Sequence, residues 1–356
     1  MNRSTLAFAS IFSLAAFACS APPPPEVAEP APTAAADDPG AVAPAPAAEA
    51  NDLAQKEAAA AAQQAAVAAA EPVGQAPAGS LLDRMPKTCS KGRVYVQVEK
   101  VLSGDAAASI SGLLDAGFKK NKDKTHADEV FAALKAGGVD PIKQIKELAV
   151  CEDGKNDLVA VTIDMSKVKD PATTLEKAIK AGDGEPAKKE VVGDVTFLSS
   201  TKSDDVLAVV GKNVLVFGKD RASVEAATKG GTKGAGFADA ASYVVWVDMP
   251  QEKGRGTLKE SGDTFVLDAA VADASLVREK EGIMSKLAQV DANVGKLPAA
   301  MQSIVKPLLP AIKNVKLSSE ADTLKITTTF PKKTIPDVLA AAKKLGPEEL
   351  SKAVRF

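Results

Sequence analysis

The sequence predicts an α+β fold in which two related lobes of mainly antiparallel sheet are covered by amphipathic helices and follow a disordered N-terminal tether. Short stretches rich in Val, Leu and Ile predict strands. Capping residues ahead of apolar runs predict helices between those strands. An Ala/Pro-rich stretch with too few large apolar residues to form a core precedes them all. Aromatic residues make up only 4% of the 356-residue chain, so aliphatic side chains must form the core.

The first 19 residues have the layout of a secretory signal peptide. Arg3 is followed by an apolar run at 6–17 and then by small residues. The run is too short to cross a bilayer as a mature helix. Residues 1–19 are therefore expected to form a signal peptide that directs export and ends at Cys19.

Cys19 follows this run directly. Ala16-Phe17-Ala18-Cys19-Ser20 resembles the lipobox of bacterial lipoproteins, although that family usually has Leu where this chain has Ala16. The resemblance implies cleavage before Cys19, a diacylglycerol on its thiol, palmitate-type acylation, and a lipid bilayer as a partner. Ser20 resembles the signal for sorting to the outer membrane, on its periplasmic or surface face. Ala16-Phe17-Ala18 also fits ordinary signal peptidase, which would leave a secreted protein with a free Cys19.

The tether spans residues 20–80. Pro22 to Pro25 and later prolines fix φ and remove backbone donors, which favours extended polyproline-like chain. Residues 51–71 contain neither Pro nor Gly and can form transient helix, but without an apolar stripe. One base, Lys56, stands against eight acids: Glu26, Glu29, Asp37, Asp38, Glu49, Asp52, Glu57 and Glu71. The expected tether is an acidic, solvated spacer.

Two further cysteines remain for the body of the protein. Cys89 precedes the predicted strand at 93–99, and Cys151 ends another apolar stretch. An even number of cysteines in an oxidising compartment predicts a disulfide, which would stabilise the fold by ~4 kcal/mol in the chain-entropy treatment. A buried free pair and a redox couple are the alternatives, but a redox couple usually has the C-x-x-C spacing that is absent here.

The body, residues 81–356, alternates predicted strands and helices. Asp153-Gly154 predicts a hairpin turn, and the even apolar run at 158–165 predicts a strand covered on both faces. Helices are predicted after four capping residues: Thr125, Asp170, Asp220 and Thr334. Further strands are predicted at 194–200, 204–211, 213–219 and 242–249, and a hairpin within 314–330.

The order of elements recurs along the body. A hairpin followed by the helix after Asp220 is echoed by a hairpin followed by the helix after Thr334. We therefore expect one lobe at 81–234 and a second at 235–356. The sequences "DDVLAVVGKNVLVFGKDRASVEAA" and "KLSSEADTLKITTTF" resemble an uncharacterised family of bacterial envelope proteins with repeated α+β modules. That resemblance implies no known activity.

Signatures of catalysis are sparse. His126 is the one histidine, and neither G-x-S-x-G nor a P-loop occurs. Ser166 and Lys169 satisfy S-x-x-K, but in a predicted strand exit and without the companion motifs of penicillin-binding enzymes. The acidic turn at 152–157 lacks the spacing of a calcium loop, and glycine-rich 229–236 is expected to be a flexible joint. The prediction is a protein that is not an enzyme and has no cofactor, metal site or nucleic-acid partner.

Apolar residues recur every three or four positions between residues 276 and 315. Pro298, Pro307 and Pro310 are expected to divide this stretch into two or three amphipathic helices. These helices would cover the sheet, or leave an apolar groove for a lipid or another hydrophobic ligand. The sequence thus predicts a membrane-anchored envelope lipoprotein that binds or scaffolds an unknown envelope protein, with a periplasmic carrier of a hydrophobic molecule as the alternative.

Overall fold

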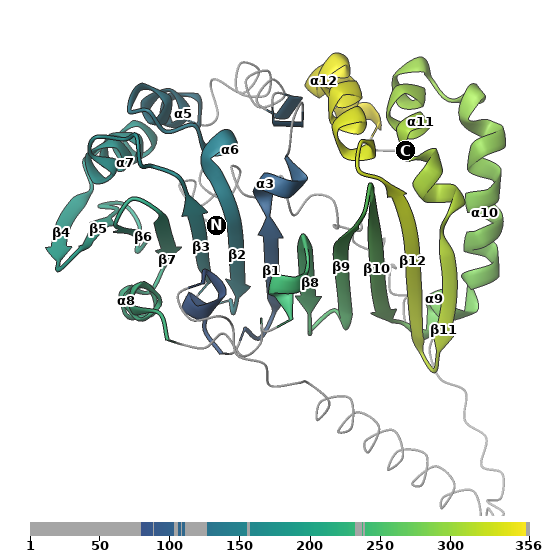
Figure 1. The fold of residues 1–356 in the computed structure, drawn as a ribbon, viewed down its shortest axis with the longest axis horizontal. Coiled ribbons are helices and arrows are strands. Elements are labelled where there is room, and N and C mark those ends of the chain that lie inside the picture. The colour runs from purple at the N-terminus through teal and green to yellow at the C-terminus, as the bar shows by residue number, and fades with distance from the viewer. Residues whose placement is uncertain are drawn as a thin grey trace, which may run out of the picture. The chain divides into compact units, whose positions relative to one another are not determined.

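One antiparallel sheet of twelve strands runs through the residues that the structure describes (Figure 1). The structure is a computed structural model, and it describes residues 80–87, 89–102, 106–107, 109–110, 127–154, 157–231, 237 and 239–353. The strands are β1 (Gly92–Gln97), β2 (Ile145–Glu152), β3 (Leu158–Ile163), β4 (Lys188–Val192), β5 (Val195–Ser199), β6 (Val206–Val210), β7 (Val214–Gly218), β8 (Val245–Met249), β9 (Gly254–Ser261), β10 (Thr264–Ala272), β11 (Lys316–Glu320) and β12 (Thr323–Pro331). The predicted α+β class with a mainly antiparallel sheet is confirmed.

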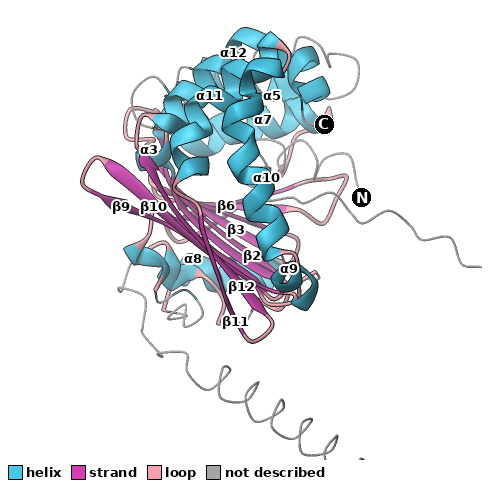
Figure 2. Cartoon of the chain, turned by 90° about the vertical axis from the view of Figure 1, so that its right-hand side faces the viewer, coloured by secondary structure: helices cyan, strands magenta, loops and turns pink. Residues whose placement is uncertain are grey.

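Helices lie between and over these strands. The α-helices are α3 (Val98–Val101), α5 (Ala127–Ala136), α6 (Pro141–Gln144), α7 (Pro171–Asp183), α8 (Arg221–Lys229), α9 (Ala274–Arg278), α10 (Lys280–Asn293), α11 (Ala299–Lys313) and α12 (Thr334–Ala353). The described residues also form three 3-10 turns: η1 (Leu82–Arg84), η3 (Ala240–Ser242) and η4 (Val294–Lys296). Figure 2 shows α5, α7, α11 and α12 on one face of the sheet and α8 on the other.

The strand order across the sheet is β11-β12-β10-β9-β8-β1-β2-β3-β7-β6-β5-β4. Strands of the predicted first lobe fill one side, strands of the second fill the other, and β1 pairs with β8 where they meet. Each half starts with a three-strand meander, and a later strand returns to pair with the third one: β7 with β3, and β12 with β10. The two halves thus share a meander and a returning strand within one sheet, but the described first half has seven strands and the second has five. The lobe boundary at 234/235 stays a prediction.

The strand register decides which side chains share a face. Tyr95 lies opposite Ala149 on one side and Trp246 on the other. The same row continues through the first half as Ala160, Val216, Ala208 and Phe197. Through the second half it continues as Thr257, Asp268, Thr327 and Lys316. We call this the α8 face, because Val224 and Ala227 of α8 pack there, and the opposite one the α7 face.

The first half is covered on both faces. On the α8 face, Phe197 is 1% exposed and Val216 is fully buried, beneath α8 and the segment that precedes β1. On the α7 face, Leu198 is 1% exposed, and α7 buries Leu175 and its neighbours while packing against α5. Strand β3 is accordingly apolar at every position except Thr162, as predicted for a strand with two covered faces.

The second half is covered differently on its two faces. On the α7 face a small core of Val244, Leu258 and Phe265 lies with half-buried Phe330 and Ile335 under the helices that include α11 and α12. On the α8 face the register places mostly polar side chains, many of them exposed: Arg255, Thr257, Lys259, Asp268, Lys325, Thr327 and Lys316. Antiparallel sheets tolerate such one-sided burial because polar side chains alternate with apolar ones.

Capping side chains fix where the helices begin. Asp170, Asp220 and Asp273 each accept hydrogen bonds from backbone N–H groups in the first turn of α7, α8 and α9. Thr334 starts α12 as predicted, whereas Thr125 lies outside the described residues.

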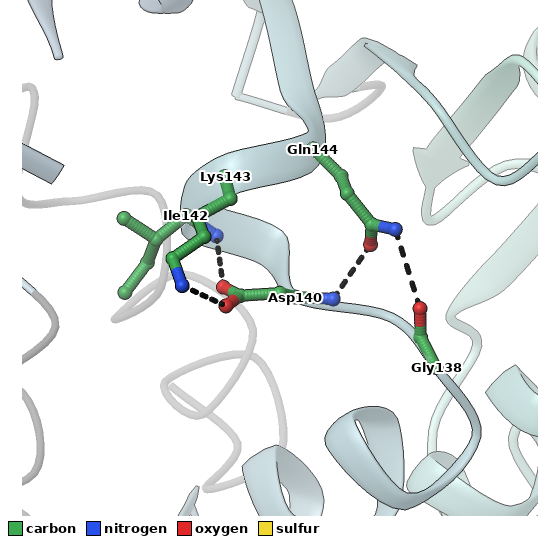
Figure 3. Close-up of polar contacts among 5 residues, drawn as sticks. All are labelled: Gly138, Asp140, Ile142, Lys143 and Gln144. Carbon is green, nitrogen blue, oxygen red and sulfur yellow. Dashed lines mark hydrogen bonds and ion pairs between the residues drawn. The ribbon is translucent and has the colours of Figure 1, made fainter. Parts of the chain in front are cut away.

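Figure 3 shows the corner through which α5 leads into β2. Asp140 accepts a hydrogen bond from the N–H of Ile142 at 3.2 Å, and its carboxylate lies 3.7 Å from Lys143 Nζ. Gln144 closes the corner, because its Oε1 accepts from the N–H of Asp140 at 2.6 Å and its Nε2 donates to the carbonyl of Gly138 at 3.2 Å. This reciprocal capping sets the direction in which β2 enters the sheet.

The prediction about the prolines between 276 and 315 is partly wrong. Pro298 does separate α10 from α11, but Pro307 and Pro310 lie inside α11. Each of these two residues removes one backbone donor, yet the flanking turns keep the helix continuous. The strong apolar stripe of α11 against β12 and α12 explains why tertiary packing overrides the local preference.

Candidate functional site

The segment that precedes β1 is a candidate functional region, because it joins the predicted tether to the sheet. Leu82 is 1% exposed, Met85 is fully buried, and both belong to the core on the α8 face. Burying side chains of this size contributes about 1.5–3 kcal/mol each. The described body therefore starts with a segment that is anchored in its main core.

Asp83 and Arg84 attach this segment to the end of α8. Arg84 Nη1 donates to the carbonyl of Thr228 at 2.6 Å and to that of Ala227 at 3.3 Å. The N–H of Gly231 donates to Asp83 Oδ2 at 3.1 Å. Carbonyl groups at a helix C-terminus lack partners within the helix and carry partial negative charge, so a guanidinium there is stabilising.

The predicted disulfide between Cys89 and Cys151 is confirmed. The two Cα atoms are 5.3 Å apart, and the residues are 5% and 0% exposed. The backbone N–H of Lys91 donates to the carbonyl of Glu152 at 2.9 Å just beyond the bond. The disulfide thus ties the incoming segment to β2, the strand next to β1.

The described residues of the predicted acidic turn at 152–157 lie at the end of β2 and between it and its paired strand β3. Asp157 Oδ1 accepts from the N–H groups of Asp153 at 3.0 Å and Gly154 at 2.7 Å, and Gly154 has a positive φ of 82°. Ser90 Oγ donates to Asp153 Oδ1 at 2.5 Å, which adds a polar contact beside the disulfide. These carboxylates act in local turn and junction contacts, as the hairpin interpretation predicts.

A polar cluster lies where the two halves meet on the α8 face. Arg93 pairs with Asp248 at 2.8 Å, and its guanidinium carbon is 6.0 Å from the ring centre of Trp246. The Trp246 ring is in turn 5.6 Å from that of Phe237. At this point the α8 face changes from the apolar row of the first half to the polar row of the second, and Trp246 is the residue at the change.

Tyr95 extends this cluster into the first half. It is 2% exposed, and its hydroxyl donates to Glu147 Oε1 at 2.6 Å. Glu147 Oε2 also accepts from the Thr162 hydroxyl at 3.2 Å. Burial, followed by the hydrogen bond to Glu147, raises the pKa of Tyr95 far above its usual value, so the hydroxyl remains a donor.

The contacts of Ser166 with other described residues are those of a turn. Its hydroxyl donates to Asp164 Oδ1 at 2.6 Å in an exposed turn after β3, and its N–H donates to the same oxygen at 3.1 Å. These two bonds hold the pKa of Asp164 below its usual value. Lys212 Nζ approaches the carbonyl of Ser166 at 3.5 Å, not its hydroxyl. The S-x-x-K spacing thus falls on a turn, not on a helix start.

Other predicted sites lie wholly or partly beyond the described residues. Cys19 and His126 are outside them, as is most of the glycine-rich stretch at 229–236. Gly230 and Gly231, which are described, have positive φ angles of 65° and 73°. Among the described residues, no group of three or more His, Cys, Asp or Glu side chains lies close enough together to hold a metal ion. The described helices include none that combines the length and apolar character needed to cross a membrane.

The helices between 274 and 313 are only partly buried. Helix α10 has no fully buried residue, and its Met284 is 38% exposed. Along α11 the apolar residues Ile304, Leu308 and Ile312 are half-buried. This layer differs from α7, where most of the apolar stripe is fully buried.

Several features of the sheet were not predicted from the sequence. Strand β4 reads as a polar loop because three of its five residues are charged, and the β9–β10 hairpin was not anticipated because its strands contain Gly and charged residues. Pairing of Arg93 with Asp248 depends on the β1–β8 register, which no local pattern encodes. The turn Gly193-Asp194 was the available signal for β4, since such a pair between Val-rich stretches is typical of a hairpin.

Comparison with known proteins adds little. No protein-family model and no curated protein matches the chain. The structure of TP0453 in its crystal form I aligns with 75% of this chain and 99% of its own, at 8% sequence identity and a TM-score of 0.36. A similarity this low carries no inference about function.

Proposed function

We propose that the chain is a lipid-anchored envelope protein whose α+β body acts as a non-catalytic binding or scaffolding module. The main support is the disulfide between Cys89 and Cys151, since such bonds persist in oxidising compartments and are rare in the cytosol. Export of the chain agrees with the signal-like residues 1–19, and anchoring agrees with the lipobox resemblance at Cys19.

The construction of the N-terminal junction also supports this role. A tethered body needs a firm attachment between its tether and its fold. Leu82 and Met85 are buried, Arg84 holds the end of α8, and Cys89 is covalently joined to β2. Residues 20–80 would place this body away from the bilayer, and two or more acyl chains on Cys19 would make the attachment stable.

Fractionation of intact cells tests the proposal. The native chain is expected in the membrane fraction, and Cys19→Ala is expected in the soluble envelope fraction. Mass spectrometry of the mature N-terminus should find an acylated Cys19. An unmodified Cys19 or an uncleaved Met1 would contradict the anchor, and a cytosolic chain with reduced Cys89 would contradict export as well.

A second candidate is a periplasmic carrier of a lipid or another hydrophobic molecule. It is favoured by the incomplete burial of α10 and α11, whose apolar side chains would gain from further cover. Native mass spectrometry of the purified chain, followed by lipid extraction, separates the two. A carrier retains or takes up apolar ligands, whereas a scaffold retains none.

A further inference from the structure

Strand β4, at one edge of the sheet, is the most exposed strand among those described. All five residues, Lys188–Val192, are exposed, and Val191 and Val192 are 63% and 47% exposed. Strand β4 ends the sheet and pairs with β5 on one side only (Figure 1). The backbone groups on its other side are directed away from the sheet.

The hairpin register identifies those backbone groups. Val192 pairs with Val195 across the two-residue turn Gly193-Asp194, and Gly193 has a positive φ of 62°. Residues flanking such a turn exchange hydrogen bonds, and the direction of the groups alternates along the strand. Glu190 and Lys188 therefore bond towards β5, while the N–H and C=O groups of Val191 and Lys189 face outwards.

The opposite edge of the sheet differs. Strand β11 is also terminal, but its exposed side chains are polar: Lys316, Ser318, Ser319 and Glu320. Helix α10 packs beside β11, and Lys325 forms an ion pair with Glu320. Polar side chains and a neighbouring helix are common ways to keep an edge unpaired. Edge β4 also carries three charged side chains, but it has two exposed valines beside its turn, and β11 has no exposed apolar side chain.

Charge along β4 is uneven. Glu190 is neutralised by Arg221 at 3.2 Å, and the same guanidinium lies 3.2 Å above the ring of Phe197. Lys188 and Lys189 are exposed and form no ion pair with another described residue, although the charge of Lys189 contributes to the lowered pKa of Asp170 at the start of α7. The edge therefore offers a β-branched apolar part next to the turn and a net positive part at its other end.

We infer that the edge of β4 is a docking site for an extended acidic segment of a partner protein, which adds to the sheet as a further strand. The inference rests on the proposed function as a binding module and names the class of partner. Backbone hydrogen bonds to Lys189 and Val191 would supply affinity, and carboxylates opposite the two lysines would supply selectivity. A second copy of the chain fits less well, because the one carboxylate in its β4, that of Glu190, is already paired with Arg221.

A peptide of defined chemistry tests the site on the purified full-length chain. The probe is a fluorescein-labelled decapeptide of alternating Val and Thr with two Asp residues at each end. Val191→Pro removes an outward N–H without removing a bond to β5, and Val191→Thr is the matched control that keeps it. Val191→Pro is expected to weaken binding roughly tenfold, and Val191→Thr to leave it nearly unchanged.

Amide hydrogen exchange supplies a second measurement. The N–H groups of Lys189 and Val191 should exchange rapidly in the free chain and become protected when the peptide binds. Substituting both Lys188→Glu and Lys189→Glu should weaken binding of the acidic peptide and leave binding of an uncharged Val/Thr peptide unchanged.

Three results would overturn the inference: no saturable binding, equal binding by Val191→Pro, or a dimer of the free chain that Val191→Pro dissociates. The last would assign the edge to a second copy. Fractionation of Cys19→Ala tests anchoring separately. If the native chain is membrane-bound but does not bind the peptide, the β4 docking site is rejected and the proposal of an anchored scaffold is unaffected.

Discussion

The two halves of the sheet share a meander and a returning strand but are packed to different degrees. In the first half both faces are covered, and Phe197, Leu198 and Val216 are almost completely buried. In the second half one face carries a small core around Phe265, and the other is largely polar. A shared order of strands thus does not require the same packing. The burial of each face depends on which helices and other segments cover it.

The difference extends to turns and cross-links. The disulfide belongs to the first half, where the described turn positions with positive φ are all glycines. In the second half Lys253 and Ala321 adopt positive φ angles of 51° and 48°, which suit glycine better. The first half is therefore expected to resist unfolding, and the second to adapt more readily.

The largest expected effect comes from the first-half core. Phe197→Ala should lower the free energy of unfolding by about 3–5 kcal/mol, because it leaves a cavity under α8. The matched change Phe330→Ala, at a half-buried ring of the second half, should cost less than half as much. Urea unfolding followed by circular dichroism measures both, with Phe197→Leu as a milder variant if the alanine variant does not fold. Equal losses of unfolding free energy in the two variants would contradict the tighter packing assigned to the first half.

The disulfide should rank next. Replacing both Cys89 and Cys151 by Ala is expected to cost ~4 kcal/mol, because a sequence separation of 62 residues is no longer closed in the unfolded chain. Thermal unfolding gives the loss, and Cys19→Ala serves as a control that should leave the midpoint unchanged. Two additional reactive thiols in the denatured native chain would show that the bond is not formed.

Helix caps should give a smaller, pH-dependent effect. Hydrogen bonds from the Ser223 hydroxyl and N–H hold the pKa of Asp220 below its usual value. Its stabilisation is therefore complete above the ordinary carboxyl pKa of about 4 and is lost as the pH falls through the lowered folded value. Asp220→Ala should cost about 1 kcal/mol at pH 7, and the difference from the native chain should shrink in acid.

The matched cap in the second half is Asp273, which begins the short helix α9. Since α9 buries no residue completely, Asp273→Ala should destabilise the chain less than Asp220→Ala does. Denaturant unfolding between pH 3 and pH 7 compares the two. A larger loss for Asp273→Ala would contradict the stronger packing assigned to the first half.

The smallest effect should be a gain. Ala321→Gly relieves a positive φ in the β11–β12 turn and should stabilise the chain by about 0.5–1 kcal/mol. The reverse change in the first half, Gly211→Ala at a φ of 56°, should destabilise by a similar amount although space is free around it. Differential scanning calorimetry distinguishes the two directions, and a loss with Ala321→Gly would show that the turn carries no strain.

Much of the fold could be predicted from local signals. Asp170 and Asp220 mark helix starts correctly, and Asp153-Gly154 forms the predicted hairpin. The largely apolar sequence of β3 correctly indicated two covered faces. Such features depend on residues that are near one another in the sequence, which explains why they could be read directly.

Features set by distant partners could not be predicted. Joining β1 to β8 makes one sheet of the two halves, and no residue pattern announces that pairing. Strand β4 depends on the β5 backbone for its conformation, so its charged residues mislead. Of the candidate site residues, Cys89 and Cys151 were found because they are the two cysteines that remain once Cys19 is assigned to lipid, whereas the contacts of Arg84 require knowledge of where α8 ends.

The place where the chain enters the sheet has a mechanical consequence. Residue 80 leads through the buried Leu82 and Met85 into β1, a strand bonded on both sides, and Cys89 is linked covalently to β2. A force applied at residue 80 would thus be shared between two interior strands and resisted by many hydrogen bonds at once. A force applied to a strand at the edge of the sheet would instead break the hydrogen bonds of that strand one after another.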